Sequence, residues 1–473
     1  MRSRLSVRAL FTAAFAVTLS ACGGAPPAAP ASPSLAAASS SGTSSASAPA
    51  TTGSAATKPA PSSASAKPAL GASGAAAPAG GPIKIGLVEP LTGSLAQVAK
   101  DNQDGFNLYL ESINNIIVGR QIQVITADDN NQADVALTKA KALVESDKVN
   151  VLMGIQATPV CYAIAGYVKD AQIPTIVTGN CGAENATSDP KYKSPYFVRF
   201  TQNTSGLFGP AGDWAAKQSF KKADILTSDY GGGLEVNDVT ATTFVLNGGS
   251  IVQELHPPLG TNDFGPYLAK LDQTADALFF FAPGTDALRF GEQFGNYVTN
   301  KKLQIIDNGS TLTHGAVLAQ LKEKLLGVVS AGIYSDALDT PASRALQQAF
   351  KAKYPGRQIS YDVAQGYSGA QVLEAALKKV NGNVEDKQGF LNSLYSVNTE
   401  TVKGPQKLDA DHDVIQNIYF YQIVKSGNDL GHKLLQTYSD VARGYQRQPG
   451  LPAPGTLKDK WVGMTKDKLL AAK

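Results

Sequence analysis

The stretch VNVLMGIQATPVCYAIAGYVKDAQIPTIVTGNCGAE, residues 149–184, contains a complete strand–helix–strand unit. Two short apolar runs, VNVLMG (149–154) and PTIVTG (174–179), flank a segment of helical periodicity that begins near Pro159. Neither run alternates strictly between polar and apolar residues, as expected for strands that are covered on both faces. The pattern therefore predicts two parallel strands joined by a crossover helix.

The same unit recurs along the chain from Pro82 onward. Short apolar runs follow one another at intervals of roughly 20 to 30 residues, which is the length of a βα repeat. The predicted strands are 83–88, 121–128, 149–154, 174–179, 196–200, 223–229, 250–255, 277–282, 303–309 and 327–334. This alternation predicts an α/β fold with parallel sheets.

The amount of repeating sequence predicts two lobes. About 390 residues exceed what one doubly wound sheet needs, so we expect two Rossmann-like lobes with a ligand cleft between them. Ligands of open α/β sheets bind beyond the carboxyl ends of the strands. The loops at those ends are rich in small and polar residues: 89–93, 154–159, 178–182, 228–233, 282–286 and 307–311.

The N-terminus has the features of an export signal. Arg2, Arg4 and Arg8 precede an apolar run (9–19) that is short for a membrane span. The following LSAC, residues 19–22, resembles the bacterial lipobox, so we expect residues 1–21 to be a lipoprotein signal peptide and Cys22 to carry lipid. An ordinary signal peptide that happens to contain a cysteine is the alternative.

Composition predicts a disordered tether over residues 22–81. This segment is almost entirely Ala, Ser, Pro, Gly and Thr and has no aromatic residue, so it cannot bury a core. Its Pro and Ala content should hold the folded part away from a membrane surface. The whole chain has 42 Lys and Arg against 39 Asp and Glu, and this balance gives no basic field for nucleic acid.

No motif predicts catalysis. The four histidines, His256, His314, His412 and His432, lack metal-ligand spacing, and neither G-x-S-x-G nor H-E-x-x-H occurs. We therefore expect no enzyme activity, no metal and no cofactor.

The order of these elements resembles that of the type I solute-binding proteins of ABC importers, in the Leu/Ile/Val-binding family. The matching pieces are IKIGLVEPLTGSLA (83–96), GRQIQVITADDNNQADVALTKAKALV (119–144), VNVLMG (149–154), AQIPTIVTGNCGAE (171–184) and SPYFVRF (194–200). The resemblance implies two lobes joined by three crossovers, closing on a small solute and presenting it to a membrane permease.

The resemblance also implies lobe boundaries. Lobe one is expected to comprise 82–200 and 334–411, and lobe two 201–333 and 412–428, including the strand VIQNIYFYQIV (414–424). The remainder, 429–473, is expected to be a C-terminal surface extension.

Alignment with the family suggests ligand-binding residues in lobe one. Thr158 stands where the family places a hydroxyl that grips the ligand carboxylate, although it could simply cap the helix that follows. Asn180 and Gly182 align with the loop that faces the ligand's ammonium group, and the family's hydroxyl is missing there. Val98 replaces a cleft tyrosine and makes the pocket more apolar.

In lobe two the alignment points away from an amino-acid ligand. Gly309, beside Asn308 and Ser310, stands where amino-acid binders place an acid that pairs with the ammonium, and an unpaired buried ammonium is costly. Asp307, Glu89 or Asp362 could substitute. The NCGA loop (180–183) also resembles the NAGA loop of relatives that carry aromatic or other carboxylic acids. Tyr230 is expected to supply a wall or a hydroxyl contact, or to pack on its own lobe.

Two cysteines remain besides Cys22. Cys161 follows one strand and Cys181 follows the next, and neighbouring parallel strands lie about 4.8 Å apart. In an oxidising compartment we therefore expect a Cys161–Cys181 disulfide; two separate buried thiols are the alternative.

These observations predict an extracytoplasmic receptor of an ABC importer, lipid-anchored to a bacterial membrane. The expected solute is a small carboxylate: an aromatic or aliphatic acid, or a branched-chain-type amino acid. The expected partners are the permease subunits and the membrane, with no nucleic acid, and the chain is expected to be a monomer. The alternative is a sensor or regulator with the same fold and no transport role.

Overall fold

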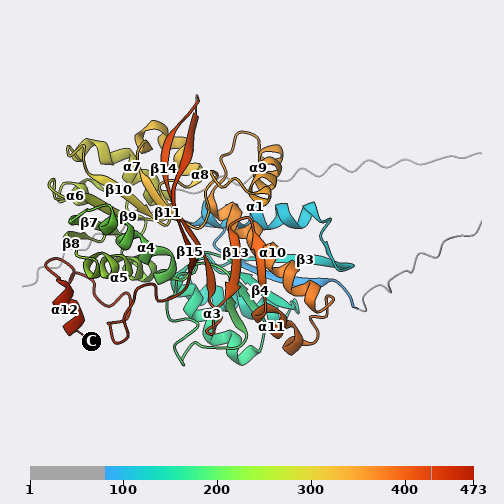
Figure 1. Ribbon diagram of the computed structural model, residues 1–473. Helices are drawn as coiled ribbons and strands as arrows, with labels where there is room; N and C mark the ends of the chain where they lie inside the picture. The colour runs from blue at the N-terminus through green and yellow to red at the C-terminus, as the bar shows by residue number, and fades with distance from the viewer. Residues whose placement is uncertain (1–79, 428, 473) are drawn as a thin grey trace, which may run out of the picture. The chain divides into compact units, whose positions relative to one another are not determined.

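The computed structural model describes residues 80–427 and 429–472, which form two α/β lobes, each built on one sheet (Figure 1). Each of the ten predicted strands overlaps a strand of the structure, so the predicted α/β class is confirmed. The predicted signal peptide, Cys22 and the tether as far as residue 79 lie outside the described residues. In the described part, no helix has the length and apolar character needed to cross a membrane.

Lobe one is built on a six-stranded sheet in the order β2-β3-β1-β4-β5-β6. All neighbouring pairs are parallel except the short hairpin of β2 and β3. The strands are β1 (Ile83–Glu89), β2 (Ile116–Ile117), β3 (Arg120–Asp128), β4 (Val151–Gly154), β5 (Thr175–Val177) and β6 (Phe197–Arg199).

Helices cover both faces of this sheet, and the alternation of side chains along β1 shows why its strands are apolar throughout. Ile85 and Leu87 belong to the core beneath α1, α10 and α11, whereas Val88 belongs to the core beneath α2 and α3. The helices are α1 (Ala96–Ser112), α2 (Ala133–Glu145), α3 (Thr158–Ala171), α10 (Tyr361–Lys379) and α11 (Lys387–Tyr395).

Lobe two is built on a nine-stranded sheet in the order β12-β13-β14-β11-β10-β9-β7-β8, with β15 also paired to β14. The strands β8, β7, β9, β10 and β11 are parallel, and β14 runs antiparallel to β11. The strands are β7 (Lys222–Thr227), β8 (Ser250–Leu255), β9 (Ala277–Phe281), β10 (Gln304–Asn308), β11 (Val329–Gly332), β12 (Asn398–Thr401), β13 (Gly404–Leu408), β14 (Val414–Ser426) and β15 (Asp429–Val441).

The helices of lobe two also lie on both faces of their sheet. One core contains residues of α4 and α5, and the other contains residues of α6, α7 and α8. These helices are α4 (Thr204–Lys217), α5 (Gly231–Leu246), α6 (Gly265–Leu268), α7 (Thr285–Tyr297) and α8 (Gly315–Leu321), followed by the 3₁₀ turn η1 (Lys322–Leu325). The helix α9 (Pro341–Lys353) contacts α1 of lobe one.

Strand β14 links the lobes. Its first residues pair with β13, and residues 419–422 pair with β11 in the middle of lobe two. Asp413 lies just before β14 and forms a fully buried ion pair with Arg199 at the end of β6. The distance between Arg199 Nε and Asp413 Oδ1 is 2.6 Å. The ion pair therefore joins the chain segment that follows β6 to the segment that precedes β14, where the chain crosses between the lobes.

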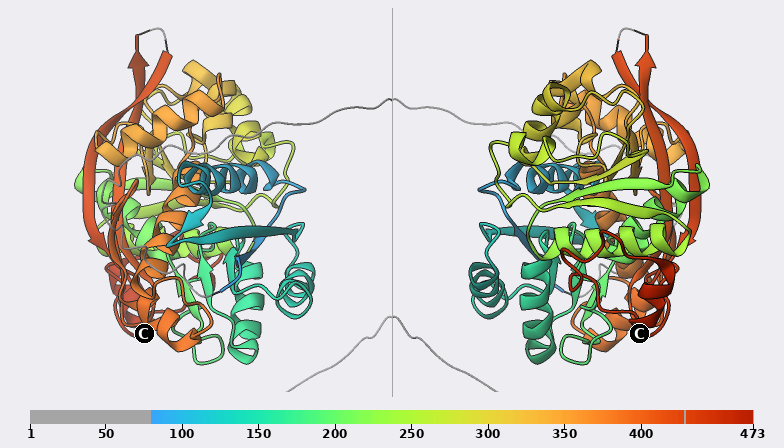
Figure 2. Two further views of the ribbon diagram at one scale, coloured as in Figure 1. Left: turned by 90° about the vertical axis from the view of Figure 1, so that its right-hand side faces the viewer. Right: turned by 90° about the vertical axis from the view of Figure 1, so that its left-hand side faces the viewer.

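The segment 429–473, expected to be a surface extension, packs on lobe two over its described residues. β15 pairs along β14, and the chain then passes beside β8, where Ile251 and Val462 form a β-bridge (Figure 2). Trp461 is fully buried, its indole N–H donates to Asp238 Oδ1 at 2.7 Å, and α12 (Lys466–Ala471) follows. Leu451, Leu457 and Trp461 therefore contribute to a core of lobe two.

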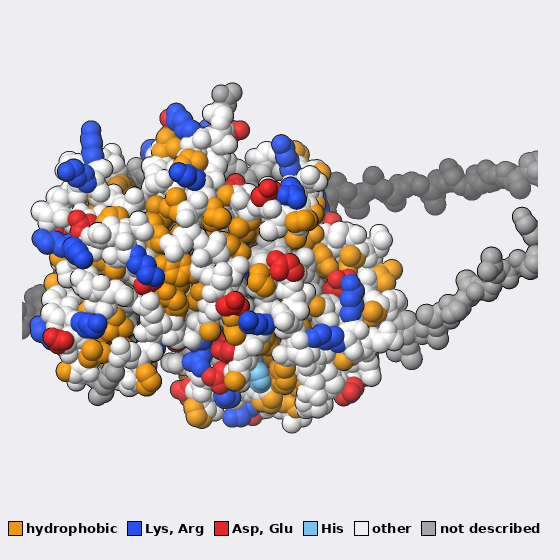
Figure 3. Space-filling view, in the orientation of Figure 1, with side chains coloured by type: hydrophobic (Ala, Val, Ile, Leu, Met, Phe, Trp, Pro, Cys, Tyr) orange, Lys and Arg blue, Asp and Glu red, His pale blue; other side chains and the backbone are white. Residues whose placement is uncertain are grey.

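Charged side chains of both signs are interspersed on the face shown in Figure 3, with apolar side chains between them. This distribution agrees with the near balance of acidic and basic residues in the sequence.

Candidate ligand-binding site

A cavity of about 380 Å³ lies where the carboxyl ends of the strands of the two sheets face each other. Every one of the six loops that the sequence singled out contributes at least one residue to its wall: Gly93, Gln156 with Ala157, Asn180, Tyr230, Pro283 with Gly284 and Thr285, and Thr311. The predicted ligand cleft is therefore present. An apolar cavity of about 150 Å³ suffices for benzene, so this one has room for a substituted ring.

Most of the wall is apolar or aromatic. Phe208 from α4 and Phe281 at the end of β9 meet edge to face with ring centroids 5.2 Å apart. Leu95, Val98 and Leu288 add aliphatic surface. Such a wall favours a solute with an apolar body because its burial removes apolar surface from water.

Tyr230, Val98 and Asn180 are the predicted site residues that line the cavity. Tyr230 occupies the N-cap position of α5, and its hydroxyl makes no hydrogen bond to another described residue. Burial raises the pKa of this hydroxyl, so it stays protonated and can donate to a bound solute.

Asn180 is held by its neighbours on every side. Its backbone N–H donates to Gln156 Oε1 at 2.8 Å, and its side-chain Oδ1 accepts from Gln202 Nε2 at 3.1 Å. Its Nδ2 donates to Tyr361 Oη at 3.1 Å and to Asp362 Oδ1. The amide orientation is therefore fixed by the protein, and both Nδ2 hydrogens are already used.

The other predicted ligand-binding residues, Thr158, Gly182, Asn308 and Gly309, do not line the cavity. Asn308 is turned into lobe two, where its Nδ2 donates to Thr240 Oγ1 at 2.6 Å. Gly309 has φ +91°, and a Cβ there would stand 2.6 Å from the Phe208 ring, so this glycine makes room for the aromatic wall.

Thr158 and Gly182 meet at the contact between the lobes. Thr158 is buried, and its Oγ1 lies 3.0 Å from where a Cβ on Gly232 of α5 would stand. A Cβ on Gly182 would stand 2.6 Å from Thr204 Oγ1, and the Gly182 carbonyl accepts from Arg199. Lobe contacts, rather than open space, surround both residues.

A disulfide and the side chain of Arg199 fix the loop that carries Asn180. Cys161 and Cys181 form a disulfide with Cα atoms 5.9 Å apart, which joins the first turn of α3 to the loop after β5. On its other side, Arg199 Nη1 donates to the carbonyls of residues 181–183, at 2.8 Å for Ala183.

His314 is an ionisable residue of the cavity wall with a strongly shifted pKa. It precedes α8 in lobe two, and its Nε2 lies 2.9 Å from Asp362 Oδ2 and 3.2 Å from Asp101 Oδ2, both in lobe one. Arg357 and Ser360 also bind Asp101, at 2.7 and 2.6 Å. Burial alone would lower the pKa of His314, but the close contact and charge of the two carboxylates raise it to about 10. The imidazole is therefore cationic at neutral pH.

None of the three carboxylates that could replace the missing acid lines the cavity. Asp307 accepts from Thr311, Thr313 and Ser330. Glu89 is fully buried, and burial raises its pKa well above the ordinary value. Asp362 lies between Asn180 and His314. Among the described residues, the wall has no Asp, Glu, Lys or Arg, and His314 is its one cationic group.

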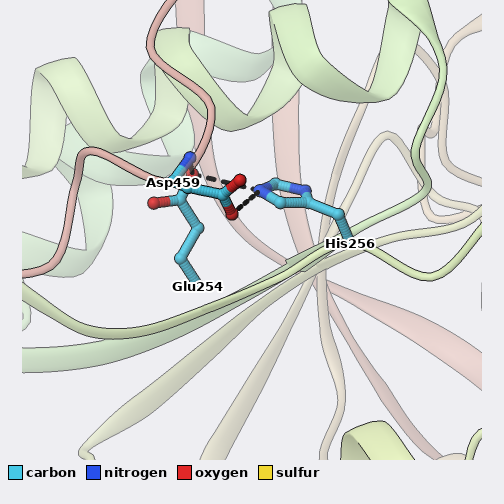
Figure 4. Close-up of side chains that lie close together, drawn as sticks. All are labelled: Glu254, His256 and Asp459. Carbon is cyan, nitrogen blue, oxygen red and sulfur yellow. Dashed lines mark hydrogen bonds and ion pairs between the residues drawn. The ribbon is translucent and has the colours of Figure 1, made fainter. Parts of the chain in front are cut away.

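A second cluster of ionisable groups lies outside the cavity, at the edge of lobe two (Figure 4). Glu254 on β8 accepts from His256 Nε2 at 3.1 Å and from the backbone N–H groups of Asp459 and Trp461, both at 3.0 Å. Asn237 Nδ2 donates to it at 2.8 Å. These bonds satisfy the carboxylate and join the C-terminal segment to β8.

Sequence reasoning missed three residues that line the cavity, namely His314, Phe208 and Tyr361. His314 was grouped with scattered histidines, although it follows a predicted cleft loop by three residues. Phe208 and Tyr361 stand inside or at the start of helices, where no loop signal marks them. Their place at the cavity follows from how the two lobes meet.

Comparison with known proteins places this geometry in a family context. The family described as periplasmic binding protein matches residues 82–428. Leu/Ile/Val-binding protein homolog 6 of Brucella melitensis is 29% identical over 379 residues, covering 78% of this chain and 94% of that protein.

Two solved structures are similar in fold and sequence. An ABC transporter solute-binding protein of Rhodopseudomonas palustris BisB5, in complex with 3,4-dihydroxybenzoic acid, has 30% identity and a TM-score of 0.72, with 77% of this chain and 99% of that chain covered. A solute-binding protein of R. palustris in complex with benzoate has 26% identity and a TM-score of 0.70 over the same shares.

Proposed function

The chain belongs to the periplasmic binding proteins, in the Leu/Ile/Val-binding family, and we propose that the solute it captures is a carboxylic acid with an apolar, ring-sized body. Members of this family are extracytoplasmic, non-enzymatic solute-binding proteins of ABC transporters. The proposal concerns which solute this member takes and how it holds it.

The observation that carries the proposal is the charge of the cavity wall. Among the described residues, the wall has one cationic group, His314, and no carboxylate. A zwitterionic amino acid would bury its ammonium there without an anionic partner, which costs several kcal/mol. A carboxylate without an amine does not have this cost.

Size and surface support the same class of solute. The aromatic pair Phe208 and Phe281, with Tyr230, offers flat apolar surface to a ring. The two R. palustris proteins, which share 30% and 26% identity with this chain, hold 3,4-dihydroxybenzoic acid and benzoate.

We further propose that the lobes close over the acid, and that the closed form delivers it to the permease. Closure brings residues of both lobes onto the solute, so binding shifts the open and closed populations. In the proposal, Cys22 carries the lipid that keeps a monomeric receptor at the membrane.

A thermal-shift panel tests the solute class. Benzoate, 3,4-dihydroxybenzoate and aliphatic acids are compared with leucine and valine at equal concentration. An acid at a hundred times its Kd should stabilise the protein by about 2.7 kcal/mol, while the amino acids should leave the melting temperature unchanged. Stabilisation by leucine or valine, with no effect of any acid, would refute the proposed class.

A further inference from the structure

His314 connects three parts of the molecule. Its side chain is 7% exposed, it belongs to lobe two, and it reaches Asp101 on α1 and Asp362 on α10, both in lobe one. It also lines the cavity. The ion pairs between the lobes and the solute cavity therefore share one imidazole ring.

The two ring nitrogens of His314 have different surroundings. Nε2 is buried and lies within 3.2 Å of carboxylate oxygens of both Asp101 and Asp362, and these contacts are ion pairs without the alignment of a hydrogen bond. Nδ1 makes no hydrogen bond to another described residue, and it is not among the buried side-chain nitrogens that lack a partner. Because the residue lines the cavity, Nδ1 is the ring nitrogen left to face it.

We propose that His314 is the anion-recognition residue of the cavity: Nδ1 donates to the carboxylate of the solute while Nε2 stays between Asp101 and Asp362. The proposal rests on the proposed function, because it assigns the group that receives the acid. It places the carboxylate in lobe two, on a residue that sequence alignment did not select.

The surrounding charges are consistent with one more anion. The charged or ionisable groups near the ring lie on three elements and one loop: Lys100, Asp101 and Asp104 on α1, Arg357 in the loop before α10, Tyr361 and Asp362 at the start of α10, and, beyond Asp362, Glu89 on β1. Arg357 pairs with Asp101 and Asp104 at 2.7 Å each, so Asp101 is not balanced by His314 alone. Burial raises the pKa of Asp362 and that of Glu89, while the contact of Asp362 with His314 acts in the opposite direction and favours its charged form.

The arrangement also couples recognition to closure. His314 comes from lobe two and its two carboxylate partners come from lobe one, so the ring is held in its orientation only when the lobes meet. A solute that accepts from Nδ1 then binds the closed form better than the open form, which is the condition for a ligand to shift the equilibrium.

Paired ligands separate an anion contact from a role in closure. Isothermal titration compares benzoate with benzamide, and 3,4-dihydroxybenzoate with 3,4-dihydroxybenzamide, on the wild type and His314→Gln. We expect His314→Gln to weaken each acid that binds by at least about tenfold, and to change its neutral amide by less than about threefold. His432→Gln is the matched control, because it removes an imidazole that lies 2.8 Å from Asp336 outside the cavity.

Nitrogen NMR of the wild type, labelled with ¹⁵N-histidine, gives a second readout that needs no folded His314 variant. Single Gln variants of the other three histidines assign His314 by elimination. At pH 8 both ring nitrogens of His314 should be protonated, and adding the acid should shift Nδ1 more than Nε2.

Four results would separate the possible failures. Equal loss of acid and amide in His314→Gln, or no shift at Nδ1 when the acid binds, overturns the anion contact and leaves the proposed function standing. An unchanged acid affinity in His314→Gln does the same. A wild type that binds no acid of the panel overturns the proposed function itself, and the anion contact with it.

Discussion

At the scale of single residues, the cavity wall gives Tyr230 a testable role. Its hydroxyl is protonated and makes no hydrogen bond to another described residue, so a hydroxylated ring could accept or donate there. We expect Tyr230→Phe to weaken 3,4-dihydroxybenzoate by about three- to tenfold, the worth of one neutral hydrogen bond. Benzoate should bind equally to both proteins in isothermal titration, and equal loss of both acids would contradict this role.

Lys403 is a second residue with a measurable consequence. It is 1% exposed, and its Nζ donates to Gln365 Oε1 at 2.6 Å and to Gln416 Oε1 at 3.2 Å, both neutral groups. Burial lowers its pKa from 10.5 to about 7. Between pH 7 and the ordinary pKa the unfolded chain therefore binds more protons than the folded one, so stability should rise with pH.

This contribution is at most about 1.4 kcal/mol per pH unit, and it should reach its full value above the ordinary lysine pKa. Urea unfolding of the wild type and Lys403→Met between pH 7 and 9 isolates it. The wild type should gain stability relative to the variant as pH rises. Parallel pH profiles would mean that Lys403 binds its proton equally in the folded and unfolded states, which would contradict the lowered pKa.

Residue pairs across the two lobes mark the limit of sequence reasoning. Val98, Asn180 and Tyr230 were found because they sit in or near loops at strand ends. The contact of His314 with Asp101 joins residues that share no local pattern, and it exists only because of how the lobes meet. Asn308 lies beside the cleft loop in sequence, yet its amide is directed toward Thr240 inside lobe two.

At the scale of elements, the buried parallel strands could be predicted and the polar ones could not. The ten predicted strands are short apolar runs, and all of them overlap strands of the two sheets. β15 reads DLGHKLLQTYSDV and is largely exposed, so hydrophobicity does not mark it. β12 and β13 are short and form a hairpin against the start of β14, a pairing that depends on the tertiary context.

The disulfide between Cys161 and Cys181 predicts a second consequence at this scale. The two residues are 20 positions apart, and a bridge over a loop of this length contributes about 3 kcal/mol by restricting the unfolded chain. We expect the double variant Cys161→Ala and Cys181→Ala to lose roughly that much in urea unfolding. Its acid affinity should also fall, because the bridge holds the loop that carries Asn180.

The single variants serve as controls for the double variant, since each removes the bridge and leaves one thiol. All three should show similar stability. A double variant as stable as the wild type would mean that the bond does not restrain the unfolded chain, and unchanged affinity would mean that Arg199 alone fixes the loop.

At the scale of the whole molecule, the account rests on two lobes that close on an acid. β14 and the Arg199–Asp413 pair join the lobes, while His314, Asp101 and Asp362 meet across the cleft beside the cavity. In the proposed closure, the first set persists in the open form and the second set forms only in the closed form.

Small-angle X-ray scattering of the protein, free and saturated with each ligand, tests this claim most directly. Residues 1–79 are the same in every sample, so differences in radius of gyration between samples report the effect of the ligand. The account predicts a smaller radius of gyration with benzoate or 3,4-dihydroxybenzoate than without ligand, and no change with leucine. Closure with leucine, or binding of an acid with no decrease in the radius, would contradict it.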